Sequence, residues 1–288
     1  MKSLRQYIKE AEEKGIAIGH FNISNLEILH GIFNAAKKLN LPVIIGAAES
    51  ERKYMGVKQI ASLVKSFREE YNYPIFLNAD HTYSFEGVKE CIDAGYSSVI
   101  FDGSGLSYEE NIKITKKCVE YAREVNPEII VEGELGFIGK SSKVLDKLPE
   151  GVKITEEFLT KPEEAKKFID ETGVDMLAPA VGNIHGMLKG GKDPALNIKR
   201  IADIKNVVKI PMVLHGASGN SKEDIQKAIK AGMNIVHVST EIRVGFRNAL
   251  EKELKAKSDE VAPYKYMDET ILAVEKVVEE KLKIFNFL

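Results

Sequence analysis

The sequence has little cysteine, little net charge and no long apolar run. Its two cysteines, Cys91 and Cys118, form no C-x-x-C pattern. We therefore expect reduced thiols of a cytoplasmic protein rather than a disulfide between them. The net charge of −2 gives no reason to expect nucleic acid or an anionic membrane as a partner. No stretch approaches the roughly 18 apolar residues that a membrane-spanning helix needs.

Residues 1–15 also lack the apolar core of a secretory signal, and they predict an amphipathic helix instead. Hydrophobic residues make up 44% of the chain and charged residues 29%, which is typical of a well-packed globular protein.

Eight short apolar runs alternate with segments of helical periodicity. The runs are nearly continuous, which is typical of parallel strands buried on both faces. They occupy residues 17–23, 42–48, 74–80, 98–103, 129–135, 176–182, 211–217 and 234–240. Eight strand–helix units predict an α/β fold, a (β/α)8 TIM barrel, with residues 1–288 as a single domain. A doubly wound open sheet is the alternative, but no G-x-G-x-x-G turn follows the first strand.

Two segments fall outside this repeat. Residues 136–161 form the longest irregular stretch, and loops of this length are usually functional lids or disordered. Residues 264–288 predict an extra amphipathic C-terminal helix. We expect this helix to pack on the barrel, and a subunit contact is the alternative.

Polar side chains gather where the predicted strands end, which is where a TIM barrel places its chemistry. Four of the six histidines belong to this set, each at a different strand. Three neutral imidazoles with an open fourth position are typical of a catalytic zinc site, where zinc polarises a substrate oxygen. The set comprises Asp80, His81, Asp102, Glu132, Glu134, His185, His215 and His237.

Asp80 and His81 are neighbours at the end of the third strand. Because side chains alternate in direction along a strand, we expect one of the two to face the metal and the other to face the substrate. The pair would then deliver a ligand and a proton carrier together.

Glycine-rich turns follow the seventh and eighth strands. Glycine lets backbone N–H groups approach an anion, and serine or threonine hydroxyls add donors. The loops after these two strands are the usual phosphate site of this barrel. The sequence thus predicts a phosphate site beside the metal, and hence a phosphorylated sugar or keto acid as substrate.

The motifs together resemble the class II, zinc-dependent fructose- and tagatose-bisphosphate aldolases. HFNISNLE (20–27) is similar to the family's G-A-F-N-x-x-N-x-E opening, and NADH (78–81) to its x-x-D-H core. FDGSGLSYEENI (101–112) and VEGELG (131–136) are similar to D-G-S-x-L-x-x-E-E-N and E-x-E-L-G. GNIHG (182–186) and LHGASG (214–219) are similar to its two later histidine motifs. The resemblance covers nearly the whole chain.

The resemblance implies a role for each matching residue. His81, His185 and His215 would bind Zn²⁺, and Asp80 would exchange a proton with the C4 oxygen of the ketose. Asp102 and Glu132 would support the metal ligands or bind the metal in an alternative position. Substrate and its C1 phosphate would be bound by Asn22, Gly186, Gly216, Ser218, His237, Ser239 and Thr240. A monovalent cation near the phosphate, and a homodimer or homotetramer, are further expectations.

The chain also departs from the family pattern. His237 stands where the family has asparagine, and Ala48 where it has serine, with Ser50 two residues on. His237 is open to three interpretations: a substrate contact, a satisfied interior histidine or a fourth metal ligand. The arginine of the family's D-P-R-K segment is Tyr264 here, and the loop acid is either Asp146 or Glu150.

These departures lie where the aldehyde half would bind. The leading hypothesis is a metal-dependent aldolase that forms dihydroxyacetone phosphate and an aldehyde from fructose or tagatose bisphosphate, which the sequence does not distinguish. An aldolase for another aldehyde, or an epimerase using the same enediolate, is the alternative. A non-catalytic sugar-phosphate-binding protein is a further one, disfavoured by Asp80. Three imidazoles suit zinc, but the sequence does not distinguish zinc from cobalt or iron.

Overall fold

A computed structural model describes residues 1–139, 143–190 and 193–288. Eight parallel strands close into a barrel in the order β1-β10-β9-β7-β5-β4-β3-β2. Their bounds are β1 Ile18–Asn22, β2 Val43–Ala48, β3 Ile75–Thr82, β4 Ser98–Phe101, β5 Ile130–Leu135, β7 Met176–Pro179, β9 Met212–Leu214 and β10 Met233–Val238. The predicted (β/α)8 barrel is confirmed, and the open sheet is wrong because β1 pairs with both β2 and β10.

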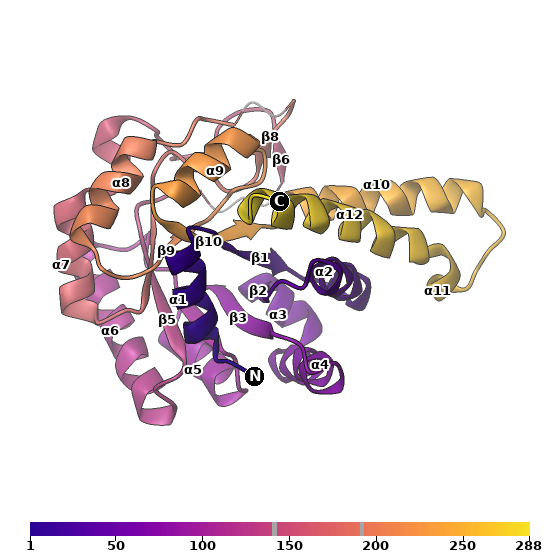
Figure 1. The fold of residues 1–288 in the computed structure, drawn as a ribbon, viewed down its shortest axis with the longest axis horizontal. Helices are drawn as coiled ribbons and strands as arrows, with labels where there is room; N and C mark the ends of the chain where they lie inside the picture. Colours follow the sequence, from indigo (N-terminus) through magenta and orange to yellow (C-terminus); the bar gives the residue numbers. More distant parts are fainter. Residues whose placement is uncertain (140–142, 191–192) are drawn as a thin grey trace.

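Helices surround the barrel and connect successive strands (Figure 1). They are α1 Leu4–Lys14, α2 Leu26–Leu39, α3 Glu49–Met55, α4 Val57–Glu70, α5 Phe85–Asp93, α6 Tyr108–Val125, α7 Pro162–Thr172, α8 Ile198–Val207, α9 Lys222–Lys230, α10 Thr240–Ala256, α11 Pro263–Tyr266 and α12 Asp268–Phe285. Among the described residues, no helix is both long and apolar enough to cross a membrane.

The inward face of the strands changes character along the barrel axis. Near the amino ends, Ile18, Phe76, Val213 and Ile235 form a small apolar core with Leu4 and Ile8 of α1. Two residues further along each strand, the inward positions hold His20, Asn78, His215 and His237, all buried. Because side chains repeat every two residues along a strand, one apolar layer closes the bottom of the barrel and a polar layer lies above it.

The C-terminal segment forms two helices rather than one. After α10, the short α11 precedes α12, which packs against α2, α10, α9 and β1. In Figure 1, α10 and α12 run side by side away from the barrel, with α11 at the far end. Val274, Val278, Leu282 and Phe285 are buried, which confirms the predicted apolar face and its packing on the barrel.

The predicted irregular stretch 136–161 contains little regular structure. The short strand β6 (Val144–Leu145) pairs in parallel with β8 (Met187–Leu188), and a 3-10 helix spans Glu156–Phe158. Residues 140–142 of this stretch lie outside the described residues. Cys91 and Cys118 are both buried and free.

Candidate active site

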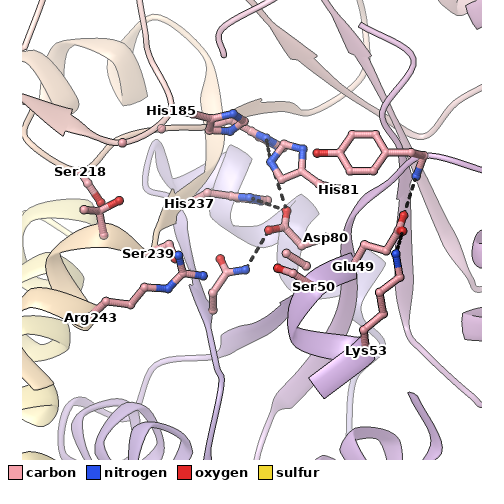
Figure 2. Close-up of a pocket in the computed structure, with 17 residues that line it drawn as sticks. Glu49, Ser50, Lys53, Asp80, His81, His185, Ser218, His237, Ser239 and Arg243 are labelled. Atoms are coloured by element: carbon pink, nitrogen blue, oxygen red, sulfur yellow. Dashed lines mark hydrogen bonds and ion pairs between the residues drawn. The ribbon is translucent and has the colours of Figure 1, made fainter. Parts of the chain in front are cut away.

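A cavity of about 320 Å³ opens at the carboxyl ends of the strands. Figure 2 shows its walls, with the imidazoles and Asp80 between a serine- and arginine-bearing side and the side formed by α3. The structure brings eleven of the sequence-predicted residues to this cavity: Asn22, Asp80, His81, His185, Gly186, His215, Gly216, Ser218, His237, Ser239 and Thr240. Asp102 and Glu132 lie behind the histidines, where they bond to His81 and His215.

The rings of His81, His185 and His215 converge from three different strand ends. Nε2 of His81 lies 3.2 Å from Nδ1 of His215. The three side chains can each offer a ring nitrogen within 4.8 Å of the others. Two nitrogens bound to one tetrahedral zinc, each at about 2.1 Å, lie roughly 3.4 Å apart. The spacing between His81 and His215 therefore suits a shared ion.

Each of these histidines also has a hydrogen-bond acceptor behind it. His81 Nδ1 donates to Asp102 Oδ2 at 3.0 Å, with Glu134 at 3.5 Å. His185 Nδ1 donates to the Gly139 carbonyl at 2.5 Å. His215 Nε2 donates to Glu132 Oε1 at 2.8 Å. The outer nitrogen of each ring thus donates to its acceptor, and the inner nitrogen is the one that would give its lone pair to a metal, as in typical metal sites. The donor set fits a zinc ion.

The electrostatics of the three imidazoles favour a cation between them. Burial lowers the pKa of His185 to about 4 and the pKa of His215 well below its ordinary value, so both rings are neutral at pH 7. Burial also lowers the pKa of His81, but Asp80, Asp102 and Glu134 outweigh it and raise that pKa to about 10. The same negative field that holds a proton on His81 stabilises a divalent cation there.

Asp80 and His81 both line the cavity although they are adjacent in sequence. The regular alternation of a strand therefore does not hold here, while the expectation that one residue faces the metal and the other the substrate stays a prediction. His81 has a left-handed backbone, with φ of 37°, and the pairing of β3 with β4 shifts register between Ala79 and Thr82. Such an irregularity rotates the chain locally and re-aims a side chain. Left-handed backbone at a non-glycine residue is costly and is typical of functional sites.

The two oxygens of Asp80 have different surroundings. Oδ2 accepts a hydrogen bond from Asn22 at 2.8 Å. Oδ1 lies 3.5 Å from His237 Nδ1 and 3.7 Å from His81 Nε2, and it accepts no hydrogen bond from the described residues. Burial opposes ionisation, but the neighbouring histidines outweigh it and lower the pKa of Asp80 well below its ordinary value. Asp80 is thus an ionised carboxylate with one oxygen anchored by Asn22 and the other facing the imidazoles of His81 and His237.

His237 faces Asp80 but is poorly placed to bind the metal with His215. The rings of His237 and His215 are stacked, with centroids 4.1 Å apart and planes 21° apart. His20 and His237 are also stacked, 3.4 Å apart at 4°. A nitrogen lone pair lies in the ring plane, so stacked parallel rings do not aim at one ion. The rings of His81, His185 and His215 instead meet at 84°, 89° and 44°.

Sequence reasoning missed several residues of the site: the lining residues Glu49, Lys53, Tyr83 and Arg243, and the buried Glu51 and His20 behind them. Buried Glu51 accepts hydrogen bonds from Asn22 at 3.0 Å and from Arg243 at 2.5 Å, and Arg243 lines the cavity. Both residues stand inside helices, α3 and α10, beyond the strand ends that the sequence analysis searched. The sequence feature that could have identified Glu51 and Arg243 is an acidic and a basic residue in the first turns of helices that directly follow strands. His20, inside β1, carried no strand-end signal.

The residues at which the chain departs from the family pattern lie partly inside and partly outside this cavity. Ala48 and Ser50 line the cavity. Tyr264 lies on α11, is 72% exposed and does not line this cavity. Neither loop-acid candidate lines it: Asp146 is 81% exposed and pairs with Lys189 at 2.6 Å, and Glu150 is exposed.

Comparisons with known proteins agree with this geometry. The family model described as "Fructose-bisphosphate aldolase class-II" matches residues 2–287. The chain belongs to the class II fructose-bisphosphate aldolase family. It is 36% identical over 287 residues to a fructose-bisphosphate aldolase of Staphylococcus aureus, covering 99% of this chain and 96% of the relative.

Solved structures show the same likeness. The YdjI aldolase from Escherichia coli K12 superposes with a TM-score of 0.82 and 30% identity, over 98% of this chain and 96% of that one. A fructose-bisphosphate aldolase from Campylobacter jejuni has a TM-score of 0.81 over 98% and 94% of the two chains. At 20% identity, that second likeness shows the fold alone. The class II aldolase is thus a carbon–carbon lyase on a TIM barrel.

Proposed function

We propose that this class II aldolase reversibly cleaves a ketose phosphate, with fructose or tagatose 1,6-bisphosphate as default substrates, to dihydroxyacetone phosphate and an aldehyde. The observation that carries the proposal is the meeting of three imidazoles with Oδ1 of Asp80 in one cavity. Zinc held by His81, His185 and His215 would polarise the substrate oxygens and stabilise the charge that develops when the C3–C4 bond breaks.

Asp80 would supply the proton transfer. Its Oδ1 faces the cavity without a hydrogen bond from the described residues, so it is available to take the proton of the C4 hydroxyl. Asn22 holds the other oxygen, which fixes the direction of the carboxylate. The low pKa of Asp80 keeps it ionised, and thus ready to act as a base, at neutral pH.

The phosphate would bind at the start of α10. Ser239 and Thr240 stand at that helix N-terminus, where backbone N–H groups and the helix dipole favour an anion. Ser239 Oγ is buried and has no hydrogen-bond partner among the described residues. At Gly216, a Cβ would lie 2.1 Å from the Ile184 carbonyl oxygen, so glycine allows the loops with Gly186 and Ser218 to close around a ligand. Arg243 and Lys53 on the cavity wall are paired with Glu51 and Glu49, each at 2.5 Å, so an anionic substrate would compete with these carboxylates for them.

Asp102 and Glu132 would position His81 and His215 rather than bind the ion first, since each accepts the outer ring proton. The proposal also includes zinc as the metal and a monovalent cation near the phosphate. It further includes a homodimer or homotetramer, a single domain over residues 1–288 and a cytoplasmic location. Buried, free Cys91 and Cys118 support a reducing compartment.

A different aldehyde partner is the second candidate. Ala48 and His237 line the cavity at two positions where the family pattern differs, and Ser50 lines it two residues after Ala48, so these changes would face the substrate. An epimerase that uses the same enediolate would need the same groups, and a non-catalytic binding protein would not need Oδ1 of Asp80.

Cleavage assays test the function directly. We expect metal-dependent release of dihydroxyacetone phosphate from fructose or tagatose 1,6-bisphosphate, lost on chelation and restored by Zn²⁺. Ketose 1-phosphates, and a panel of aldehydes offered with dihydroxyacetone phosphate, identify the preferred partner. Turnover that survives complete removal of metal would refute the proposal, and epimerised product without cleavage would favour the epimerase.

A further inference from the structure

His20 belongs to the polar layer of the barrel, between His237 and Asn78. It is 1% exposed and stands directly beside His237, because the two residues are register partners on the adjacent strands β1 and β10. Their rings are stacked almost perfectly parallel, with centroids 3.4 Å apart and an angle of 4°. A close parallel stack fixes the plane of both rings, since tilting one ring would drive it into the other.

The position of His20 is set from its other side. Its Nε2–H donates to Asn78 Oδ1 at 3.2 Å, and Asn78 Nδ2 donates to Ser98 Oγ at 2.8 Å. Between β1 and β3 lies Gly46 of β2, where a Cβ would stand 2.1 Å from Cε1 of His20. Glycine at that position therefore leaves the space through which the imidazole reaches across β2 to Asn78.

His237 has its own contact on the cavity side. Its Nδ1 lies 3.5 Å from Asp80 Oδ1, the oxygen that accepts no hydrogen bond from the described residues. A chain of contacts thus runs from Ser98 through Asn78 and His20 to His237, and from there to the carboxylate. His20 and His237 also both depart from the family pattern described above: its opening motif has alanine at the position of His20, and asparagine stands at the position of His237.

We propose that His20 is a positioning residue for the aldol reaction: its ring holds the ring of His237 in the plane that keeps His237 Nδ1 against Oδ1 of Asp80. The inference rests on the proposed function, because it gives His237 a part in orienting the proposed base. His20 itself does not line the cavity. Its effect passes through the stacked ring and not through contact with substrate.

Two variants separate the ring face from the hydrogen bond. His20→Gln keeps a donor for Asn78 but removes the stacking surface, and His20→Phe keeps a flat ring but removes the donor. We expect kcat to fall in His20→Gln by about 10- to 100-fold, since small misplacements of catalytic groups have effects of this size. KM and zinc content should change little, and His20→Phe should recover most of kcat. His30→Gln, on α2 against Phe67, is the matched control.

A spectroscopic readout makes the test independent of turnover. With six histidines in the chain, long-range ¹H–¹⁵N correlation spectra of the metal-free protein can assign the tautomer of each imidazole. The proposal requires one and the same tautomer of His237 in the wild type and in His20→Phe. In His20→Gln, where the ring is released, we expect exchange between tautomers.

The outcomes are distinct. If His20→Gln retains kcat within about twofold and leaves the His237 signals unchanged, the proposal is overturned. If His20→Gln keeps the wild-type kcat and His20→Phe loses it, then the hydrogen bond to Asn78 matters and the ring stack does not. That result also overturns the proposal. If the wild type cleaves no ketose phosphate, the proposed function fails, and the spectra of His237 still decide whether His20 orients it.

Discussion

His215 and Glu132 form a fully enclosed pair: Nε2 of His215 donates to Oε1 of Glu132 at 2.8 Å, and each side chain is 1% exposed. Burial and the nearby charge of Asp80 raise the pKa of Glu132 well above its ordinary value, against the opposing effect of His81. The bond fixes which nitrogen of His215 carries the proton. Glu132 thereby holds the ring of His215, one of the three proposed zinc ligands, in its orientation.

Removing this acceptor should weaken metal binding. In Glu132→Ala, the outer N–H of His215 loses its partner, so the ring is free to turn and to change tautomer. We expect zinc affinity to fall about 10- to 100-fold, the usual effect of losing such a support. Competition against a chelating dye measures this affinity. Glu128→Ala, an exposed carboxylate just before β5, is the control and should bind zinc like the wild type.

Replacing the proposed base should abolish turnover and spare metal. Asp80→Asn keeps the size and the anchor to Asn22 but cannot take a proton, so we expect kcat to fall about 10²- to 10⁴-fold. Steady-state kinetics with zinc analysis on the same samples tests this. Asp93→Asn, an exposed acid on α5, serves as the control. Equal turnover in wild type and Asp80→Asn would remove Asp80 from the mechanism.

Arg52 should be important for stability rather than for substrate. This buried side chain donates to the Ala47 carbonyl, to the Asp80 carbonyl at 2.8 Å and to Thr82 Oγ1 at 2.8 Å. Arg52→Met leaves these acceptors without their donor, and we expect the free energy of unfolding to fall by about 3 kcal/mol. Urea denaturation monitors it. Exposed Arg247→Met should change stability far less, and an equal loss in both would contradict the buried role.

The two thiols should be unreactive in the native protein. Burial raises the pKa of Cys91 to about 11 and the pKa of Cys118 to about 12. Since the thiolate is the nucleophile, both groups stay protonated and inert at pH 8, and their reactivity should rise only as the pH approaches these values. Titration with a thiol reagent should find neither group in the native state and both in urea. Rapid labelling of the native protein at pH 8 would show that the helices over these cysteines open.

Much of the fold could be predicted because each buried strand is a recognisable apolar run in the sequence. The convergence of His81, His185 and His215 followed from one topological rule, that parallel strands present their carboxyl ends at one rim. The rule did not reach His20, which stands mid-strand, or Glu51 and Arg243, which stand inside helices. Nor does a period of two reveal a local break in that period, and for this reason the shared direction of Asp80 and His81 was missed.

The apolar layer beneath the histidines has a consequence for traffic through the enzyme. Leu4 and Ile8 of α1 pack against the strands and close the amino end of the barrel. Among the described residues, the cavity opens at the opposite, carboxyl end of the strands, so the substrate and both products would enter and leave there. We expect the product that binds deeper in this cavity to dissociate last. The order of product release would then depend on depth in the cavity and not on affinity alone.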